Sequence, residues 1–274
     1  MTSVRRGNGT RVQAAAIVAI ALSALAAAAG SAPAPASAPG IKNIVLVHGA
    51  FADGSSWAKV IPILQAKGYN VTAVQNPLTS LADDVAATQR TLAQQDGPVI
   101  LVGHSWGGVV ITEAGTDPKV AGLVYVAAFG PDQGEVVGDL GKAYPPPPAF
   151  TAPIVDAQGF MTLPTDAVLK HFAQDLPPAE ARVVAATQGP VSVSAFGSKV
   201  SNVAWKMKPS WYIVSAQDGA IAPDEERFFA KRMKATTTEL KASHVSMLSQ
   251  PQAVAAVILD AAAKARAGGV AEAH

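Results

Sequence analysis

One short stretch carries the residues best suited to chemistry, a serine set between glycines directly after an apolar run. Residues 99–102 read Val-Ile-Leu-Val, and residues 103–107 continue as Gly-His-Ser-Trp-Gly. A buried strand that enters such a Gly-x-Ser-x-Gly turn lifts the serine hydroxyl clear of the main chain, at the N-terminus of the next helix. Helix amides there favour a developing negative charge. The pattern predicts that Ser105 is a nucleophile. An ordinary glycine-rich strand-to-helix turn is the alternative.

A serine hydroxyl is a poor nucleophile at neutral pH and needs a base that a third group orients. His244 is the predicted base, because it follows an expected strand at 236–240 and precedes the last expected helix. The alternative for His244 is a surface-loop histidine. The four other histidines have different contexts: His48 and His104 in turn motifs, His171 in an irregular segment and His274 near the chain end.

The orienting acid has three candidates. Asp218 follows an expected strand ending at Ser215, and its loop position beside a glycine suits a carboxylate that reaches His244. Asp224 is a rival, although its place after a proline suits the first turn of a helix. Asp132, after the fourth expected strand, is the second rival. We predict Asp218 as the acid.

Two main-chain amides must stabilise the oxyanion that forms when serine attacks a carbonyl. The residue after the nucleophile, Trp106, supplies one amide. The loop after the first expected strand supplies the other, which we assign to Ala50, since Gly49 lets that backbone approach closely. Phe51 and Trp106 flank these groups and are the predicted substrate-binding side chains.

Runs of β-branched residues and helical spacing of apolar residues define the elements that position these groups. Their alternation predicts an α/β fold, with a mostly parallel sheet and helices on both faces. The expected strands are 41–47, 69–74, 99–102, 120–129, 209–215 and 236–240. The expected helices are 55–67, capped by Ser55 or Ser56, then 81–92, 106–114, 223–233 and 251–265.

The segment at about 130–202 interrupts this alternation. It holds no clear strand and is punctuated by prolines, including the run at 145–148. A structureless loop of that length is unusual in a compact domain. We predict a small helical cap inserted into a domain spanning 41–267, followed by a flexible tail at 268–274.

The first forty residues have a different character. Arginines precede an alanine-rich apolar stretch, and small residues and prolines follow. This order is typical of a secretory signal peptide, predicted at 1–29, with a Pro/Ala linker at 30–40. The predicted location is therefore secreted or periplasmic. An uncleaved N-terminal anchor is the alternative, and it is the one expected contact with a membrane.

Composition narrows the partners and cofactors. The chain has 274 residues, a net charge of +1 and no cysteine. The absence of cysteine excludes thiolate metal sites and disulfides. The sequence has no dense Lys/Arg tract of the kind that binds nucleic acid, and no His-x-x-x-His pair of the kind that binds a metal. We expect no cofactor and a small-molecule substrate, while the oligomeric state stays open.

These residues together resemble a known superfamily. Residues 48–51 (His-Gly-Ala-Phe), 103–108, Asp218 and 243–247 are similar to the motifs of the α/β-hydrolase superfamily. Within it they resemble the branch of plant methylesterases, hydroxynitrile lyases and their bacterial esterase relatives. The likeness covers about 41–265 and implies the α/β-hydrolase fold.

The branch contains both esterases and lyases, and three positions separate them. The lyases carry threonine, glutamate and lysine where this chain has Gly49, His104 and Val245. The resemblance therefore implies hydrolysis of a small, apolar carboxylic ester through an acyl-enzyme, making the chain a serine esterase. The alternatives are cofactor-free haloperoxidase or perhydrolase activity, a low-turnover ligand-binding homologue and, least favoured, a lyase.

Overall fold

The computed structural model describes residues 40–265. Its centre is a six-stranded sheet in the order β2-β1-β3-β4-β8-β9, and every neighbouring pair is parallel. The predicted α/β fold with a parallel sheet is confirmed. The strands are β1 (Asn43–Val47), β2 (Asn70–Ala73), β3 (Val99–His104), β4 (Val120–Val126), β8 (Ser210–Ser215) and β9 (Thr236–Leu240).

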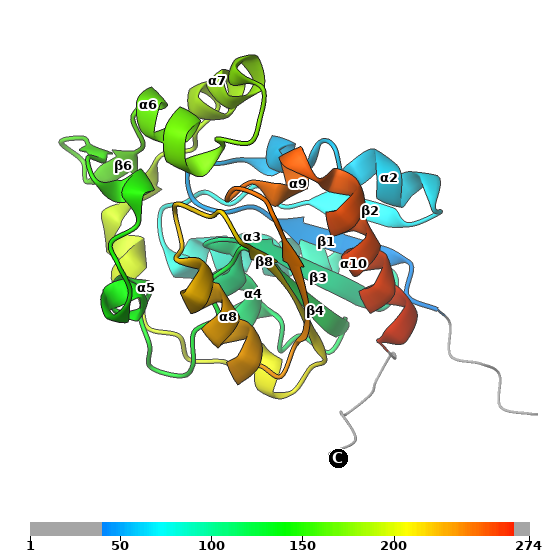
Figure 1. Cartoon of the computed structure of the whole chain (residues 1–274). Helices are drawn as coiled ribbons and strands as arrows, with labels where there is room; N and C mark the ends of the chain where they lie inside the picture. Colours follow the sequence, from blue (N-terminus) through cyan, green and yellow to red (C-terminus); the bar gives the residue numbers. More distant parts are fainter. Residues whose placement is uncertain (1–39, 266–274) are drawn as a thin grey trace, which may run out of the picture. The chain divides into compact units, whose positions relative to one another are not determined.

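Helices cover both faces of this sheet (Figure 1). On one face α2 and α10 pack against each other, and on the other face α3 packs against α4 while α8 lies against β8. A short helix, α9, leads into α10. The bounds are α2 (Ile61–Ala66), α3 (Leu81–Ala93), α4 (Gly107–Ala114), α8 (Pro223–Arg232), α9 (Ser246–Ser249) and α10 (Pro251–Lys264).

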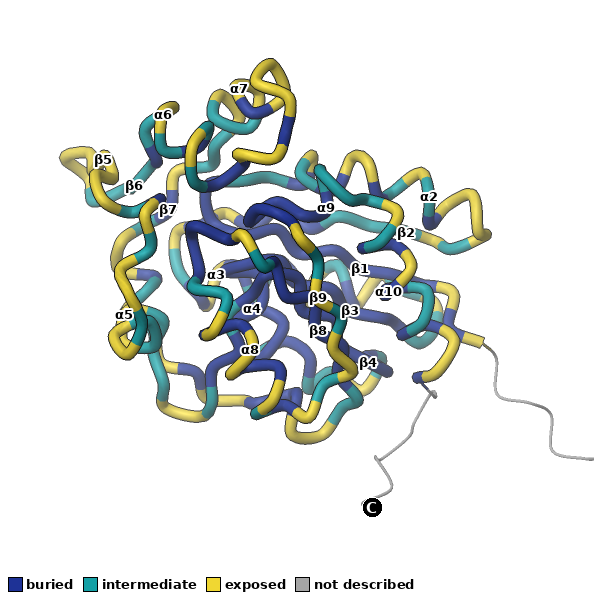
Figure 2. Tube along the Cα trace, viewed as in Figure 1, coloured by how far each residue is buried: buried dark blue, intermediate teal, exposed yellow. Residues whose placement is uncertain are grey.

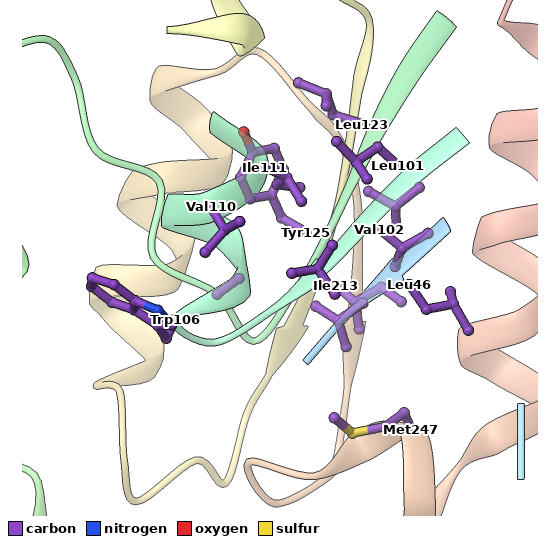
Figure 3. Packing of buried hydrophobic residues seen from close by; sticks show 14 of the residues in the cluster. Leu46, Leu101, Val102, Trp106, Val110, Ile111, Leu123, Tyr125, Ile213 and Met247 are labelled. Carbon is purple, nitrogen blue, oxygen red and sulfur yellow. The ribbon is translucent and has the colours of Figure 1, made fainter. Parts of the chain in front are cut away.

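The central strands form the core. Every residue of β1, β3, β4 and β8 is buried, whereas the edge strands β2 and β9 are partly exposed (Figure 2). Strands covered on both faces read as continuous apolar runs, which is the pattern in the sequence. Figure 3 shows Leu101 and Val102 of β3 among the core side chains, with Val110 and Ile111 on α4. Burying each such side chain contributes about 1.5–3 kcal/mol, so the strand ends that carry the site are rigidly held.

The expected helix at 55–67 is divided in two. A 3₁₀ turn at Gly54–Trp57 is capped by Asp53, whose side chain accepts from the Ser55 amide at 2.6 Å. The α-helix begins only at Ile61, with Pro62 in its first turn. Proline has no N–H to donate, so it is tolerated at a helix start and not inside one. The predicted serine cap is therefore wrong, and the cap is Asp53.

The segment between β4 and β8 contains a second sheet that the sequence pattern did not predict. Three short antiparallel strands, in the order β5-β6-β7, lie among short helical pieces. Strands this short carry no readable alternation, which is why the segment was expected to be helical only. Its elements are α5 (Val137–Leu140), β5 (Ile154–Val155), β6 (Phe160–Thr162), α6 (Thr165–Ala167), a π turn (Val168–Phe172), α7 (Pro178–Ala186) and β7 (Val191–Ser192), with 3₁₀ turns at Gly141–Ala143, Pro148–Phe150, Val193–Gly197 and Ala204–Lys206.

Three predictions concern the ends of the chain. The signal peptide at 1–29, the linker up to residue 39 and the tail at 268–274 lie outside the described residues and stay predictions. In the part of the chain that the structure describes, no helix has both the length and the apolar character to cross a bilayer.

Candidate active site

The turn between β3 and α4 holds Ser105 in a left-handed conformation, with φ of 53°. This conformation costs a non-glycine residue about 1–3 kcal/mol, and such strain is concentrated at functional sites. Glycine is required on both sides of it. A Cβ on Gly103 would lie 2.5 Å from the Gly107 carbonyl oxygen, and a Cβ on Gly107 would lie 2.5 Å from the Val47 carbonyl oxygen. The turn is therefore as tight as the sequence motif implied.

Gly107→Ala is expected to lower the free energy of unfolding by about 3 kcal/mol or more, because the added methyl group meets main chain that cannot rotate away. Urea unfolding followed by circular dichroism measures the change. Gly197→Ala is the matched control, since a Cβ there meets no heavy atom within 4 Å. Equal unfolding midpoints for the two variants would contradict this reading of the turn.

His244 and Asp218 meet beyond the ends of β9 and β8. His244 Nδ1 donates to Asp218 Oδ2 at 2.5 Å, and both side chains are buried. The other carboxylate oxygen, Oδ1, accepts from the amides of Ala220 at 2.6 Å and Ile221 at 3.0 Å. Three donors thus fix the carboxylate, and the carboxylate sets the tautomer in which His244 Nε2 is free to accept a proton.

The two rival acids lie elsewhere and have other partners. Asp132 pairs with Lys206, and Asp224 pairs with Arg227 at 2.7 Å in the first turn of α8. Both pairs are on the surface, and Asp218 is therefore the acid that the fold brings to His244.

Within residues 40–265, no group of three or more His, Asp or Glu side chains is arranged to hold a metal ion.

His104 joins the serine turn to the His244 loop. Its Nε2 donates to the His244 carbonyl oxygen at 2.9 Å, and the two rings lie 4.6 Å apart. Burial, and next to it the neighbouring His244 ring, hold the pKa of His104 well below 6.5, so the ring is neutral. Phe172 packs on His244 at 4.7 Å, and His244 Nε2 is buried without a hydrogen-bond partner among the described residues. The sequence motif gave no sign of this link.

The two predicted oxyanion amides border the serine. Neither the Ala50 nor the Trp106 amide donates to a main-chain acceptor within residues 40–265. The loop after β1 lies directly against Ser105, because a Cβ on Gly49 would be 2.7 Å from Ser105 Cβ. The arrangement leaves two free donors close to Ser105, although their role stays a prediction.

His48 fixes the loop that carries Ala50. Its Nδ1 donates to the Gly49 carbonyl oxygen at 2.8 Å, while its Nε2 accepts from the Asn76 amide at 2.9 Å. Burial lowers the pKa of His48, and a neutral ring is the form that can accept at Nε2. Both ring nitrogens are occupied, so His48 has a structural part in the loop.

Asp84 on α3 is a further supporting residue, which the sequence pattern does not single out. Its Oδ2 accepts from Trp106 Nε1 at 2.7 Å, and its Oδ1 accepts from the Leu78 amide at 2.8 Å. The side chain is fully buried, and burial raises its pKa. Asp84 thereby anchors the residue that follows the nucleophile.

Asp84→Asn is expected to lower the free energy of unfolding by about 1–3 kcal/mol, because asparagine offers one acceptor oxygen to two buried donors. The unfolding midpoint in urea tests this. Asp83→Asn is the control, since Asp83 is exposed on the same helical turn and its carboxylate accepts only in exposed hydrogen bonds from the Thr79 and Ser80 hydroxyls. Its midpoint should fall less than that of Asp84→Asn. A stable Asp84→Asn variant would remove the anchoring role.

A pocket of about 270 Å³ adjoins this site beneath α7. Phe51 lines it as predicted for a substrate-binding residue, whereas the Trp106 side chain is not among its lining residues and is held by Asp84 instead. Lys59 and Glu180 form an ion pair at 2.5 Å across the rim. The lining is mostly apolar and comprises Phe51, Ala52, Asp53, Ser55, Ser56, Lys59, His104, Phe172, Leu176, Glu180, Val183, Val184, Thr187, Val245 and Leu248.

Known proteins share this architecture. The chain is 34% identical over 119 residues to the carbendazim hydrolyzing esterase of Nocardioides sp., covering 38% of this chain and 49% of that protein. It is 38% identical over 108 residues to salicylic acid-binding protein 2 of Nicotiana tabacum, covering 33% and 41%. The chain thus spans half or less of these two relatives. The pyrethroid hydrolase of Sphingobium wenxiniae matches at 27% identity over 249 residues, covering 80% of this chain and 87% of that protein.

A solved structure and a family model extend the comparison. The crystal structure of polyneuridine aldehyde esterase superposes with a TM-score of 0.70 at 22% identity, covering 80% of this chain and 98% of that one, which shows the fold. Plant methylesterases are also among the relatives, so the resemblance proposed from the motifs is confirmed. The model of the alpha/beta hydrolase family matches residues 44–257. The chain therefore belongs to the alpha/beta hydrolase family.

Proposed function

We propose that the chain is an exported serine esterase that cleaves small, apolar carboxylic esters through Ser105, His244 and Asp218. The observation that carries the proposal is the buried bond of 2.5 Å between His244 Nδ1 and Asp218 Oδ2, on a loop tied by His104 to the serine turn. Relatives named as esterases and a pyrethroid hydrolase support ester hydrolysis.

The reaction proceeds by acyl transfer. His244 Nε2 takes the proton of Ser105 as its oxygen attacks the ester carbonyl, and Asp218 stabilises the imidazolium. The amides of Ala50 and Trp106 donate to the oxyanion, and each such donor contributes about 3 kcal/mol to transition-state stabilisation. His244 then protonates the leaving alcohol. Water, activated by the same histidine, releases the acid from Ser105.

The pocket supports a substrate with an apolar group. Its lining includes His104, which precedes Ser105, Phe172, whose ring packs on His244, and Val245, which follows His244. An apolar lining binds uncharged groups by removing their surface from water. Because Val245 is apolar, no positive charge at this position stabilises an anionic leaving group. This suits the alcohol of an ester, which leaves in its neutral form.

A panel of p-nitrophenyl esters with graded acyl groups tests the function. We expect acetate to butyrate esters to be hydrolysed well above the buffer rate, and charged acyl groups to be disfavoured by the apolar pocket. Release no faster than in buffer across the whole panel would contradict ester hydrolysis.

Export rests on the N-terminal sequence, with its arginines, alanine-rich stretch and small-residue segment. Expression of the full chain in a bacterium, followed by N-terminal sequencing of protein from the periplasm and the medium, tests it. We expect a start near residue 30. Recovery only in the cytoplasm with the N-terminus intact would contradict export.

A further inference from the structure

Behind Asp218, at the start of α8, lies a buried acid that the reaction above does not use. Glu226 is 0% exposed. Its Oε2 accepts from the Ser215 amide, at the end of β8, at 2.9 Å. Its Oε1 is buried and has no hydrogen-bond partner among the described residues. An ionised carboxylate in such a place would be strongly disfavoured.

No cation within residues 40–265 is paired with Glu226. The neighbouring Arg227 points to the surface, where it bonds Glu239 at 2.7 Å and Asp224 at 2.7 Å. The group beside Glu226 is another acid. The Asp218 amide donates to the Ser215 carbonyl oxygen at 3.1 Å, on the same residue whose amide donates to Glu226, and the two carboxyl groups interact. Burial and the charge of Asp218 raise the pKa of Glu226 well above 4.5. Two adjoining carboxyl groups cannot both ionise readily, and one keeps a proton.

The hydrogen bonds of Asp218 show which of the two carboxyl groups, Asp218 or Glu226, keeps the proton. Asp218 already accepts three hydrogen bonds, from Ala220, Ile221 and His244. These bonds occupy both carboxylate oxygens of Asp218 as acceptors. Glu226 accepts only one, so the shared proton belongs on Glu226. There it can be donated toward Asp218.

We propose that Glu226 is a positioning residue for Asp218. The protonated carboxyl of Glu226 accepts from the Ser215 amide and donates to Asp218, the acid that orients His244. The proposal rests on the proposed function, because it assigns Asp218 to the reaction. Glu226 touches no reacting atom and acts through Asp218. Glu226 holds Asp218 in place relative to both the first turn of α8 and the end of β8.

Glutamine has the same shape and the required polarity, one oxygen to accept and one NH₂ to donate. Glu226→Gln should therefore keep kcat within about twofold of the wild type at neutral pH. Leucine fills a similar volume without either bond. Glu226→Leu should lower kcat by about tenfold to a hundredfold with little change in KM, since displacing a catalytic group by about 1 Å has an effect of this order.

The pH profile separates positioning from mere packing. As pH rises through the pKa of Glu226, which lies well above 4.5, the wild-type kcat should fall, because the donor disappears and two carboxylates then repel. Glu226→Gln should lack that fall. The other ionisable groups near Glu226 are Asp218, Tyr212 on β8 and Arg227 and Glu225 on α8.

Glu225 supplies the matched control. It lies on the same turn, and burial and the charge of Asp218 raise its pKa to about 7. Glu225→Gln removes that titration but leaves Glu226 in place, so its kcat should still fall as pH rises through the pKa of Glu226. Loss of that fall in Glu225→Gln and not in Glu226→Gln would overturn the proposal, as would equal losses of kcat in Glu226→Gln and Glu226→Leu, or none in either.

The pH dependence of the unfolding temperature, Tm, measures the protonation of Glu226 independently of activity. The unfolded chain releases the Glu226 proton near a pKa of 4.5, whereas the native chain keeps it to higher pH. Native stability from this group is therefore complete below that pH and declines as pH rises toward the native pKa. The Tm of Glu226→Gln minus the Tm of the wild type should therefore increase with pH, because only the wild type loses this stability. A constant difference overturns the proposal, whereas absent ester hydrolysis with a growing difference overturns only the proposed function.

Discussion

Ser105→Ala is expected to lower kcat for a short-chain p-nitrophenyl ester by about 10⁴-fold or more. The variant keeps the pocket and both proposed oxyanion amides but lacks the proposed nucleophile, and removing a serine nucleophile in other hydrolases has effects of this order. The strained turn remains, because alanine at φ of 53° meets the same main-chain restriction as serine. Steady-state kinetics with wild-type and variant protein of matched Tm measures the loss.

A second serine controls for the substitution itself. Ser194 lies in the segment between β4 and β8 and is exposed. Ser194→Ala should hydrolyse the ester at the wild-type rate. If Ser105→Ala retains more than about one hundredth of wild-type kcat, another residue is the nucleophile and the proposed reaction is wrong.

Asp218→Asn is expected to lower kcat by about 10⁴-fold with little change in stability, as for the matching substitution in a serine protease. The surrounding bonds dictate how asparagine sits. The Ala220 and Ile221 amides require an acceptor, so the amide oxygen faces them. The NH₂ group then faces His244 Nδ1, which must accept. The proton moves to Nε2, and the histidine can no longer take the proton of Ser105.

The matching change at the rival acid separates the two assignments. Asp224 lies on the surface, paired with Arg227, and Asp224→Asn should leave kcat unchanged. Both variants are compared with the wild type across pH. A large loss in Asp224→Asn together with full activity in Asp218→Asn would reverse the assignment of the acid.

The residues placed by local pattern were predictable from the sequence. Ser105 stands in a turn whose glycines are forced by contacts of 2.5 Å, and the motif carries that constraint in its letters. His244 and Asp218 were expected near each other because the carboxyl ends of parallel strands meet at one edge of a sheet. Topology alone, read from alternating elements, was enough to bring them together.

The supporting contacts were not predictable, because each joins two different elements of the fold. His104 bonds the main chain at His244, Asp84 bonds the Trp106 ring, and Glu226 bonds the amide of Ser215. In each case one polar side chain is buried by elements that only the folded chain brings together. A buried Asp or Glu on an amphipathic helix looks in sequence like one more solvent-facing charge.

The segment between β4 and β8 was the least predictable part of the fold. Its strands β5 and β7 span two residues each and β6 spans three, so none shows an alternating pattern. Their pairing is set by turns, such as the one in which Asp156 accepts from the Phe160 amide at 2.9 Å. This segment also supplies Phe172, Leu176 and α7 to the pocket, which is why the sequence leaves the choice of ester open.

Covalent labelling with a fluorophosphonate tests the central claim most directly, because these reagents phosphonylate a serine only when a neighbouring base activates it. Intact-protein mass spectrometry and peptide mapping should find one label per chain, on Ser105, in the wild type. Labelling should be absent in Ser105→Ala and strongly slowed in Asp218→Asn. A label on a different residue, or undiminished labelling of Ser105→Ala, would contradict the assignment of Ser105 as the activated nucleophile.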